Sequence, residues 1–401
     1  MNIINVTKPA LPPLPELMPL LEDIWESGVV TNGGKCHELF KNRLKQYLGV
    51  KALSLFNNAT IGLLATIKAL DLKGEVITTP YSFVATTHAL AWNNIKPVFA
   101  DVCMGDFNIC PVEIEKRITE HTSAILAVHC YGSPCDIDSL QRLADRYKIK
   151  LVFDAAHAFG VKFKGKSIAE FGDASILSFH GTKVFNTFEG GAVISRDANV
   201  IFKLEKLKNF GFTSETTVEA IGINGKMSEF NAALGIVQLR HIDSYILKRK
   251  AIYEYYLQAL RKVPGLIMPF DGENRAKIQN YGYFPIRVTS RFRITRDELY
   301  KNLVKKGINT RRYFYPLISD FDSYRTEHRD ERRNLLNAAK LAEEVLCLPL
   351  YPTLTETEIE KVVKEVSVCG PAYLQKTQCH EVIKPGGDYC APERCLAATR
   401  Y

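Results

Sequence analysis

Two ionisable residues stand at the ends of apolar runs in the middle of the chain. Asp154 ends the run at residues 151–153, and Lys183 follows the run at 174–178 after a short turn. Because parallel strands place their carboxyl ends at one edge of a sheet, a carboxylate and a lysine in these positions can face one cavity. A lysine taken alone is usually a solvated surface residue, and an aspartate after a strand usually caps a helix. Only the pair together suggests chemistry.

This pairing suits pyridoxal 5′-phosphate (PLP). The lysine amine would form a Schiff base with the cofactor aldehyde, and the aspartate would keep the pyridine nitrogen protonated so that the ring can take up electrons. The negative charge of Asp154 would act by raising the pKa of the pyridinium. Lys183 and Asp154 are therefore the predicted catalytic residues, and PLP is the predicted cofactor.

Three residues are predicted to hold the phosphate of this cofactor. Ala59 and Thr60 stand where a strand is expected to give way to a helix, and free amides and a hydroxyl there would form a phosphate cradle. A simple helix N-cap would use the same residues. Ser178 would place its hydroxyl near the same phosphate, although a serine at a strand end often bonds only to backbone.

Two further residues are predicted to contact the cofactor ring. Phe83 could stack on it, and His157 could orient the ring or Asp154. A place in the hydrophobic core is the alternative for both. His129 and His180 are interpreted as packing residues.

Residues 160–167 fit the nucleotide triphosphatase pattern G-x-x-x-x-G-K-[ST] letter by letter. That loop requires a strand directly before it and a helix directly after it. Here 161–164 alternates like a strand, 165–167 is typical of a hairpin turn, and 168–173 is too short for the helix. We therefore predict a hairpin, and a triphosphatase is the weaker alternative.

The elements that must position these residues alternate between about residues 35 and 240. Short apolar runs predict seven strands, at 53–56, 75–79, 97–101, 124–128, 151–153, 174–178 and 192–195. Amphipathic stretches between them predict helices, including one over 136–147. The alternation predicts an α/β fold with a mostly parallel seven-stranded sheet.

The whole chain is expected to divide into four parts. They are an N-terminal arm and helix (1–30), a large PLP-binding α/β domain (31–245), a smaller C-terminal α+β domain (246–367) and a cysteine-containing tail (368–401). A long helix is expected up to residue 260, then a strand at 281–288 and helices over 295–306 and after Thr355. The tail lacks paired Cys-x-x-Cys spacing, so we predict a weakly ordered extension and no metal site.

The composition argues against several classes of protein. The 401 residues are 46% hydrophobic and 24% charged, with a net charge of +8. Lys and Arg are scattered, so the excess suits anionic small molecules such as nucleotide phosphates, and no nucleic-acid partner is expected. No run reaches the roughly 18 apolar residues of a membrane span. Without a secretion signal or a compact cysteine scaffold, a cytoplasmic protein with reduced thiols is expected.

Together these motifs resemble the DegT-type nucleotide-sugar aminotransferases, which belong to PLP fold type I. The most specific part is Asp-Ala-Ala-His at 154–157 followed by Ser-Phe-His-Gly-Thr-Lys at 178–183. Supporting segments occur in the same order along the chain, at 31–34, 80–85, 128–132, 189–191, 224–228 and 232–239. The resemblance extends to about residue 366.

The resemblance implies a homodimer with two active sites at the interface, in which Asn224 reaches the phosphate of the neighbouring subunit's cofactor. It also implies L-glutamate as the amino donor and a nucleotide sugar as the acceptor. Substrate contacts are expected from Thr31, Asn32 and Gly33, and from a second segment comprising Arg311, Arg312, Tyr313 and Tyr315. The family usually has glycine where Ala59 stands; if that turn needed a positive φ, alanine would cost about 1 kcal/mol.

The residues around Lys183, with Glu-Gly-Gly at 189–191, resemble the group that aminates C4 of a 4-keto-6-deoxy nucleotide sugar. The expected acceptor is dTDP-4-keto-6-deoxyglucose, for a 4-amino sugar of a bacterial surface glycan such as an O-antigen. C3-aminating enzymes and enzymes that use GDP- or UDP-sugars are the alternatives within the family. A sugar dehydratase would carry histidine at the lysine position, and a non-catalytic relative should have lost Lys183 or Asp154.

Overall fold

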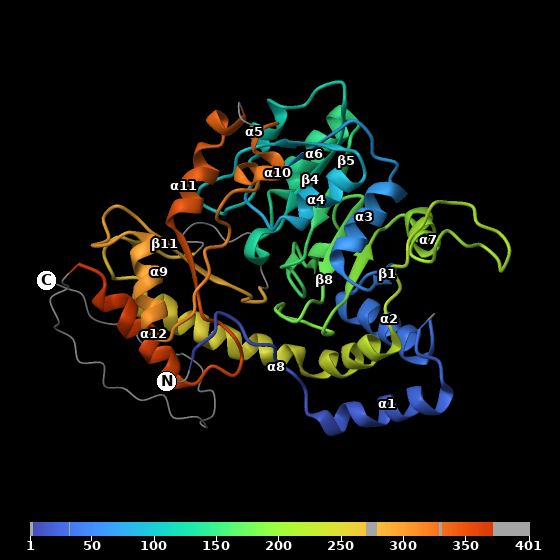
Figure 1. Cartoon of the computed structure of the whole chain (residues 1–401), viewed down its shortest axis with the longest axis horizontal. Helices are drawn as coiled ribbons and strands as arrows, with labels where there is room; N and C mark the ends of the chain where they lie inside the picture. The colour runs from blue at the N-terminus through green and yellow to red at the C-terminus, as the bar shows by residue number, and fades with distance from the viewer. Residues whose placement is uncertain (1–2, 32, 270–278, 329–330, 372–401) are drawn as a thin grey trace, which may run out of the picture.

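The computed structural model describes residues 3–31, 33–269, 279–328 and 331–371. Figure 1 shows a larger lobe built on a central sheet and a smaller lobe beside it, with the long helix α8 (Glu229–Leu260) running beneath both. At 1.5 Å per residue, the 32 residues of α8 span about 48 Å. The predicted division at 245/246 falls inside this continuous helix, and we retain that division as a proposal.

The central sheet has seven strands in the order β1-β9-β8-β5-β4-β2-β3. Five of them, β3, β2, β4, β5 and β8, are parallel, whereas β9 is antiparallel to both β8 and β1. The predicted mostly parallel α/β fold is thus confirmed. The strands are β1 (Leu53–Phe56), β2 (Glu75–Thr78), β3 (Lys96–Phe99), β4 (Thr122–Val128), β5 (Lys150–Asp154), β8 (Ala174–Ser178) and β9 (Gly191–Ile194).

Helices cover both faces of this sheet, which is why its strands read as continuous apolar runs. Alternate residues of β5 show the two faces: Leu151 and Phe153 belong to one apolar core, and Val152 belongs to the other. The first core includes residues of α1 (Leu14–Ser27), α2 (Lys35–Leu48), α5 (Pro111–Glu115), α6 (Ile137–Tyr147) and α8. The second includes residues of α3 (Ala59–Ala69), α4 (Ala85–Trp92) and α7 (Ala198–Leu207).

The smaller lobe contains an antiparallel sheet in the order β10-β11-β12. Its strands are β10 (Leu266–Ile267), β11 (Phe284–Val288) and β12 (Val345–Leu348), so the strand predicted at 281–288 begins three residues later than expected. Its core includes residues of α8, α9 (Arg296–Lys305) and α12 (Glu356–Val368). The helices α10 (Asp322–Arg325) and α11 (Leu336–Glu344) contribute to a further apolar cluster between this sheet and the larger lobe.

The N-terminal arm is packed into the seam between the lobes. Ile4 is buried and forms a β-bridge with Ile308 of the smaller lobe. The Val6 carbonyl accepts a 3.1 Å hydrogen bond from the Leu350 amide, and the Ala10 carbonyl accepts a 2.7 Å bond from the Gln238 side chain. The arm therefore contacts the smaller lobe through Ile4 and Val6, and α8 through Ala10, before α1 begins.

The segment that mimics a nucleotide triphosphatase loop is a hairpin. Strands β6 (Lys162–Phe163) and β7 (Lys166–Ser167) pair antiparallel, and Gly165 in the connecting turn has a φ of +78°. The turn is therefore Lys164-Gly165, one residue earlier than predicted. A 3₁₀ turn (Ile168–Glu170) follows in place of the helix that a phosphate loop needs.

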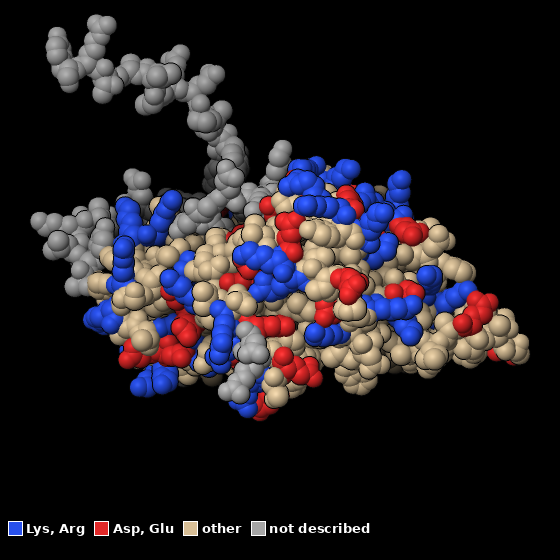
Figure 2. Space-filling view, turned by 90° about the horizontal axis from the view of Figure 1, so that it is seen from above, with Lys and Arg blue, Asp and Glu red and all other residues tan. Residues whose placement is uncertain are grey.

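The surface in Figure 2 carries both signs of charge, with Lys and Arg interspersed among Asp and Glu. None of the helices in the described part of the chain is long and apolar enough to cross a membrane.

Candidate active site

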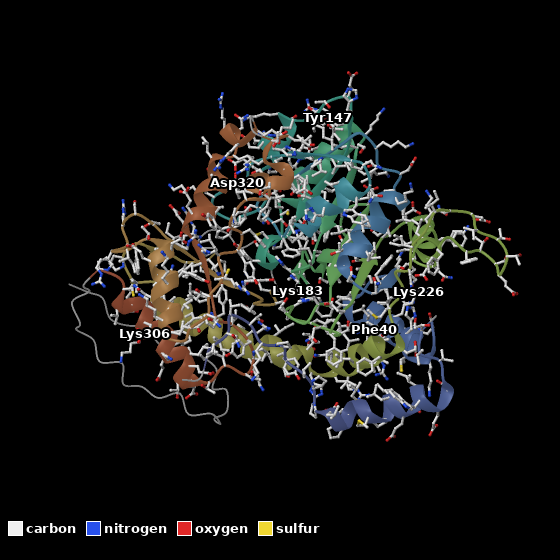
Figure 3. All side chains as sticks on the ribbon, in the orientation of Figure 1. Phe40, Tyr147, Lys183, Lys226, Lys306 and Asp320 are labelled. Atoms are coloured by element: carbon white, nitrogen blue, oxygen red, sulfur yellow. The ribbon has the colours of Figure 1, made fainter. Side chains whose placement is uncertain are left out.

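A cavity of about 330 Å³ opens at the carboxyl edge of the central sheet. Figure 3 shows Lys183 at the seam between the lobes, above α8. The walls of the cavity come from the larger lobe, from the smaller lobe and from Val6 and Thr7 of the N-terminal arm. The cavity thus lies where the ends of parallel strands meet α3 and β12, as expected from the positions of Asp154 and Lys183 at strand ends.

Asp154, the last residue of β5, is buried in the cavity wall. Its Oδ2 accepts a 2.7 Å hydrogen bond from the Thr86 hydroxyl, and its Oδ1 accepts a 3.1 Å bond from the Ala156 amide. Burial raises the pKa of Asp154, while the two hydrogen bonds and the positive charge of Lys183 lower it. The donors from α4 and from the turn after β5 therefore favour the carboxylate form.

Lys183 lies in the turn after β8, where its backbone amide donates a 2.9 Å bond to the carbonyl of His180. Its Nζ lies 3.4 Å from the hydroxyl of Tyr283. Burial lowers the pKa of Lys183 to about 8, opposed by the charge of Asp154. A large fraction of the amine is therefore neutral near pH 8, the state in which a lysine attacks a carbonyl carbon.

The N-terminus of α3 faces the cavity at a third side. Asn58 caps the helix by accepting a 2.8 Å bond from the Ile61 amide, which leaves Ala59 and Thr60 in the cavity wall together with Ser178. Amides at a helix N-terminus bind anions such as phosphate. Ala59 is the first residue of the helix and is not among the residues with positive φ, so alanine at the position where the resemblance led us to expect glycine brings no backbone strain.

The glycine pair after the lysine turn permits this helix to approach the sheet. A Cβ built on Gly191, the first residue of β9, would lie 2.8 Å from the backbone nitrogen of Ala59. A Cβ on Gly190 would lie 2.2 Å from the hydroxyl oxygen of Thr187. The atoms near Gly190 belong to side chains, whereas those near Gly191 are backbone, so Gly191 is the position that requires the absence of a side chain and allows α3 its close approach.

His157 and Phe83 both line the cavity. The His157 Nδ1 accepts a 3.2 Å bond from the Tyr131 amide, so a neutral ring carries its proton on Nε2. Burial and the charge of Lys183 hold the pKa of His157 well below its usual range, which favours this neutral form. Phe83 is 59% exposed, which leaves its ring available to a bound planar group.

The predicted substrate residues are only partly gathered at this cavity. Tyr313 lines it, but Thr31, Gly33 and Tyr315 do not lie among its described lining residues. Tyr315 instead packs beneath the guanidinium groups of Arg296 and Arg312, at 4.9 and 5.1 Å from the ring centre. Asn32 lies outside the described residues.

The two histidines interpreted as packing residues, His129 and His180, differ in their surroundings. His129 is buried and stacks on Phe153 at 4.5 Å, so its interpretation as a packing residue is confirmed. The same interpretation was wrong for His180, which lines the cavity and shares a 2.8 Å hydrogen bond with the Thr182 hydroxyl. It is the polar turn after β8 that keeps His180 out of the core.

Sequence reasoning missed three contributors to the site: Thr86, Tyr283 and the arm residues Val6 and Thr7. Thr86 lies on α4, with its hydroxyl also 2.9 Å from that of Ser82. The hydroxyl-rich start of this helix was a usable signal. No sequence pattern ties Tyr283 or the arm to Lys183, because they are distant along the chain.

These residues fit PLP. A buried carboxylate, a lysine with a lowered pKa and a helix N-terminus line one cavity, which supplies a partner for each end of the cofactor. Lys183 would hold its aldehyde carbon, Asp154 its ring nitrogen, and Ala59, Thr60 and Ser178 its phosphate. Bound there, PLP would supply an electron-poor ring that stabilises negative charge at a neighbouring carbon.

Comparison with known proteins decides the family. The profile of the DegT/DnrJ/EryC1/StrS aminotransferase family matches residues 15–367. The chain belongs to this family. The sequence-based resemblance is thereby confirmed, and the chain is an aminotransferase by family.

Individual relatives of this aminotransferase agree with that assignment. It is 46% identical over 363 residues to a dTDP-4-amino-4,6-dideoxy-D-glucose transaminase of Shigella dysenteriae, covering 90% of this chain and 98% of the relative. It is 48% identical over 367 residues to a transaminase of the same name from Escherichia coli, covering 90% and 97%. Among solved structures, DesI in the presence of its TDP-sugar product matches with a TM-score of 0.85 and 32% identity, covering 92% of this chain and 93% of that one.

Proposed function

We propose that this aminotransferase moves an amino group from L-glutamate to C4 of a 4-keto-6-deoxy nucleotide sugar, with dTDP-4-keto-6-deoxyglucose as the acceptor. The observation that carries the proposal is the placement of Lys183 and Asp154 on one cavity beside the N-terminus of α3. The choice of sugar rests on the two transaminases that share 46% and 48% identity with this chain. A GDP-perosamine synthase and a dTDP-3-amino sugar transaminase share only 30% and 28%.

Each residue would have a defined task. The Lys183 amine, once released by the incoming amino donor, would carry a proton away from the donor Cα and later return one to the sugar carbon. Asp154 would hold a proton on the ring nitrogen, and the donors Thr86 and Ala156 would keep its carboxylate charged and oriented. The α3 amides would fix the phosphate, so that the reacting carbon stays within reach of Lys183.

We further propose that the enzyme is a homodimer in which each chain completes the other's site. Asn224 is exposed and does not line the described cavity of its own chain. It lies in the segment between α7 and α8 that projects from the right side of Figure 1. Exposed apolar side chains are concentrated on the same segment: Phe210, Phe212, Val218, Ile221 and Ile223.

This concentration supports an interface, since a monomer rarely exposes so many large apolar residues together. Ile221 is 89% exposed, which leaves almost all of its side chain available to a second chain.

We retain the cytoplasm as the proposed compartment. The buried thiols of Cys36, Cys130 and Cys347 are unpaired, as is usual in a reducing environment.

The first half of the proposed reaction can be tested by absorption spectroscopy. Purified protein loaded with PLP is expected to show a visible band that is lost when L-glutamate is added and returns when dTDP-4-keto-6-deoxyglucose follows. Lys183→Ala should lack the lysine-linked band from the start. A band that L-glutamate leaves unchanged would contradict the amino donor, and a band restored only by another nucleotide sugar would contradict the acceptor.

A further inference from the structure

The hydroxyl of Tyr283 contacts the reactive amine of Lys183, and no sequence pattern pointed to this residue. Its hydroxyl oxygen lies 3.4 Å from Nζ of Lys183, and both residues line the cavity. Tyr283 comes from the smaller lobe, directly before β11, whereas Lys183 follows β8 of the larger lobe. The contact therefore joins the two lobes at the reacting atom.

The tyrosine ring is held from several sides. Its centre lies 4.7 Å from the ring of His157, 5.6 Å from that of Tyr131 and 6.0 Å from that of Tyr313. Phe284, the next residue, pairs with Leu348 in the antiparallel sheet and is fully buried. The hydroxyl therefore has a fixed position, set by the sheet below and the aromatic rings around it.

A phenol in this position can accept one hydrogen bond from the amine and still offer its own proton. Burial raises the pKa of Tyr283 well above its ordinary value, so the group is neutral at every pH at which the enzyme would work. A separation of 3.4 Å is longer than the usual range of about 2.7–3.2 Å for such a hydrogen bond, so the contact is a weak one that the amine can leave and rejoin.

We propose that the Tyr283 hydroxyl is a positioning group for Lys183. This hydroxyl holds the ε-amine of Lys183 beside the cavity whenever that amine is not joined to the cofactor. The inference rests on the proposed aminotransferase function. Lys183 must be free while it carries a proton, and a four-carbon side chain without a partner would sample several rotamers in that interval. Tyr283 would reduce this sampling without taking part in the proton transfer.

Tyr283→Phe removes the acceptor and keeps the ring contacts, so the variant is expected to fold. Its kcat should fall by about 3- to 10-fold, the effect of losing one neutral hydrogen bond, with little change in the KM for L-glutamate. The matched control is Tyr256→Phe. Tyr256 packs on Phe284 at 5.2 Å, and its buried hydroxyl has no hydrogen-bond partner among the described residues.

A second readout uses the protein without PLP. The rate at which trinitrobenzenesulfonate labels Lys183 is followed against pH by peptide mass spectrometry, which gives the midpoint at which the amine loses its proton. For the wild type this midpoint is expected at about 8. A charged amine is the better hydrogen-bond donor, so loss of the phenol oxygen disfavours the charged form and should move the midpoint to lower pH.

The proposal requires both effects in Tyr283→Phe and neither in Tyr256→Phe. An unmoved midpoint would overturn it, whatever happens to kcat, because the hydroxyl would then not bind the amine. A moved midpoint with unchanged kcat would also overturn it, because the contact would not matter to turnover. The labelling experiment needs neither cofactor nor sugar, so it gives the same answer if the acceptor sugar proposed above is wrong.

Discussion

The hydroxyl of Thr86 donates a 2.7 Å hydrogen bond to Oδ2 of Asp154, and both side chains are buried. The bond joins α4 to the end of β5 and favours the charged form of a carboxylate whose pKa burial would otherwise raise further. The protonation of the predicted ring-nitrogen partner is thus controlled by a residue on a different element.

Replacing this donor should weaken the enzyme more at low pH than at high pH. In Thr86→Val the pKa of Asp154 rises, so its carboxylate is protonated at a higher pH as the solution is acidified. The acid limb of a kcat/KM profile should therefore shift to higher pH, and kcat/KM should drop by about 10- to 100-fold, as for a hydrogen bond to a charged group. Thr86→Ser should recover most of the loss.

Thr87→Val is the control for that substitution. Thr87 is adjacent on α4 and equally buried, and its hydroxyl has no hydrogen-bond partner among the described residues. It should leave the pH profile unchanged. An equal loss of kcat/KM in Thr86→Val and Thr87→Val would show that valine disturbs α4 at either position. The proposed role of Thr86 would then have to be abandoned.

The cap of α3 offers a test of the phosphate cradle. Asn58→Ala removes a side-chain cap and should lower the free energy of unfolding by about 1 kcal/mol. Asp197→Ala removes the corresponding cap of α7, away from the cavity, and should cost about the same. Only Asn58→Ala should also weaken PLP binding, measured as the Kd in a fluorescence titration. Equal PLP affinity in both variants would remove α3 from the cofactor site.

Gly191 should tolerate no side chain. In Gly191→Ala the new Cβ would lie 2.8 Å from the Ala59 nitrogen, so β9 or the start of α3 must move. We expect a loss of stability of about 1–3 kcal/mol, as for overpacking, together with weaker PLP binding. Gly105→Ala is the control, since no atom lies within 4 Å of its Cβ position. Denaturant unfolding and the same PLP titration would measure both; a Gly191→Ala protein with wild-type values would contradict the tight approach.

The proposed sharing of each site between two subunits predicts complementation between two inactive variants. If Asn224 serves the neighbouring subunit, a hybrid dimer of Lys183→Ala and Asn224→Ala chains contains one site with both residues intact. Random assembly on co-expression should then restore about one quarter of wild-type activity, because half of the dimers are hybrids with one of two sites complete. If Asn224 serves its own chain, every site lacks one residue and the mixture stays inactive.

The sequence allowed the fold and the central pair to be predicted for a physical reason. Strands buried on both faces give apolar runs, and the polar residues that end those runs, Asp154 and Lys183, must meet at the carboxyl edge of a parallel sheet. The start of α3 followed from the same logic. These features depend on short-range pattern and on one rule of topology.

The rest of the site depends on contacts between distant parts of the chain. Tyr283 of the smaller lobe contacts Lys183 of the larger lobe. Thr7 lines the cavity because the N-terminal arm lies between the two lobes. Tyr315 shows the reverse case: its position in the sequence suggested substrate binding, but two arginines pack on its ring. Such contacts between distant residues depend on how the two lobes pack together, and no local sequence pattern predicts that packing.

The most direct test of the central claim is to follow the amino nitrogen itself. Wild-type enzyme with PLP, L-glutamate labelled with ¹⁵N and dTDP-4-keto-6-deoxyglucose should yield a nucleotide sugar that carries ¹⁵N on C4, identified by mass spectrometry and NMR. Lys183→Ala should yield none. A wild-type product labelled on C3, or no labelled sugar under conditions in which the enzyme retains PLP, would contradict the proposed function.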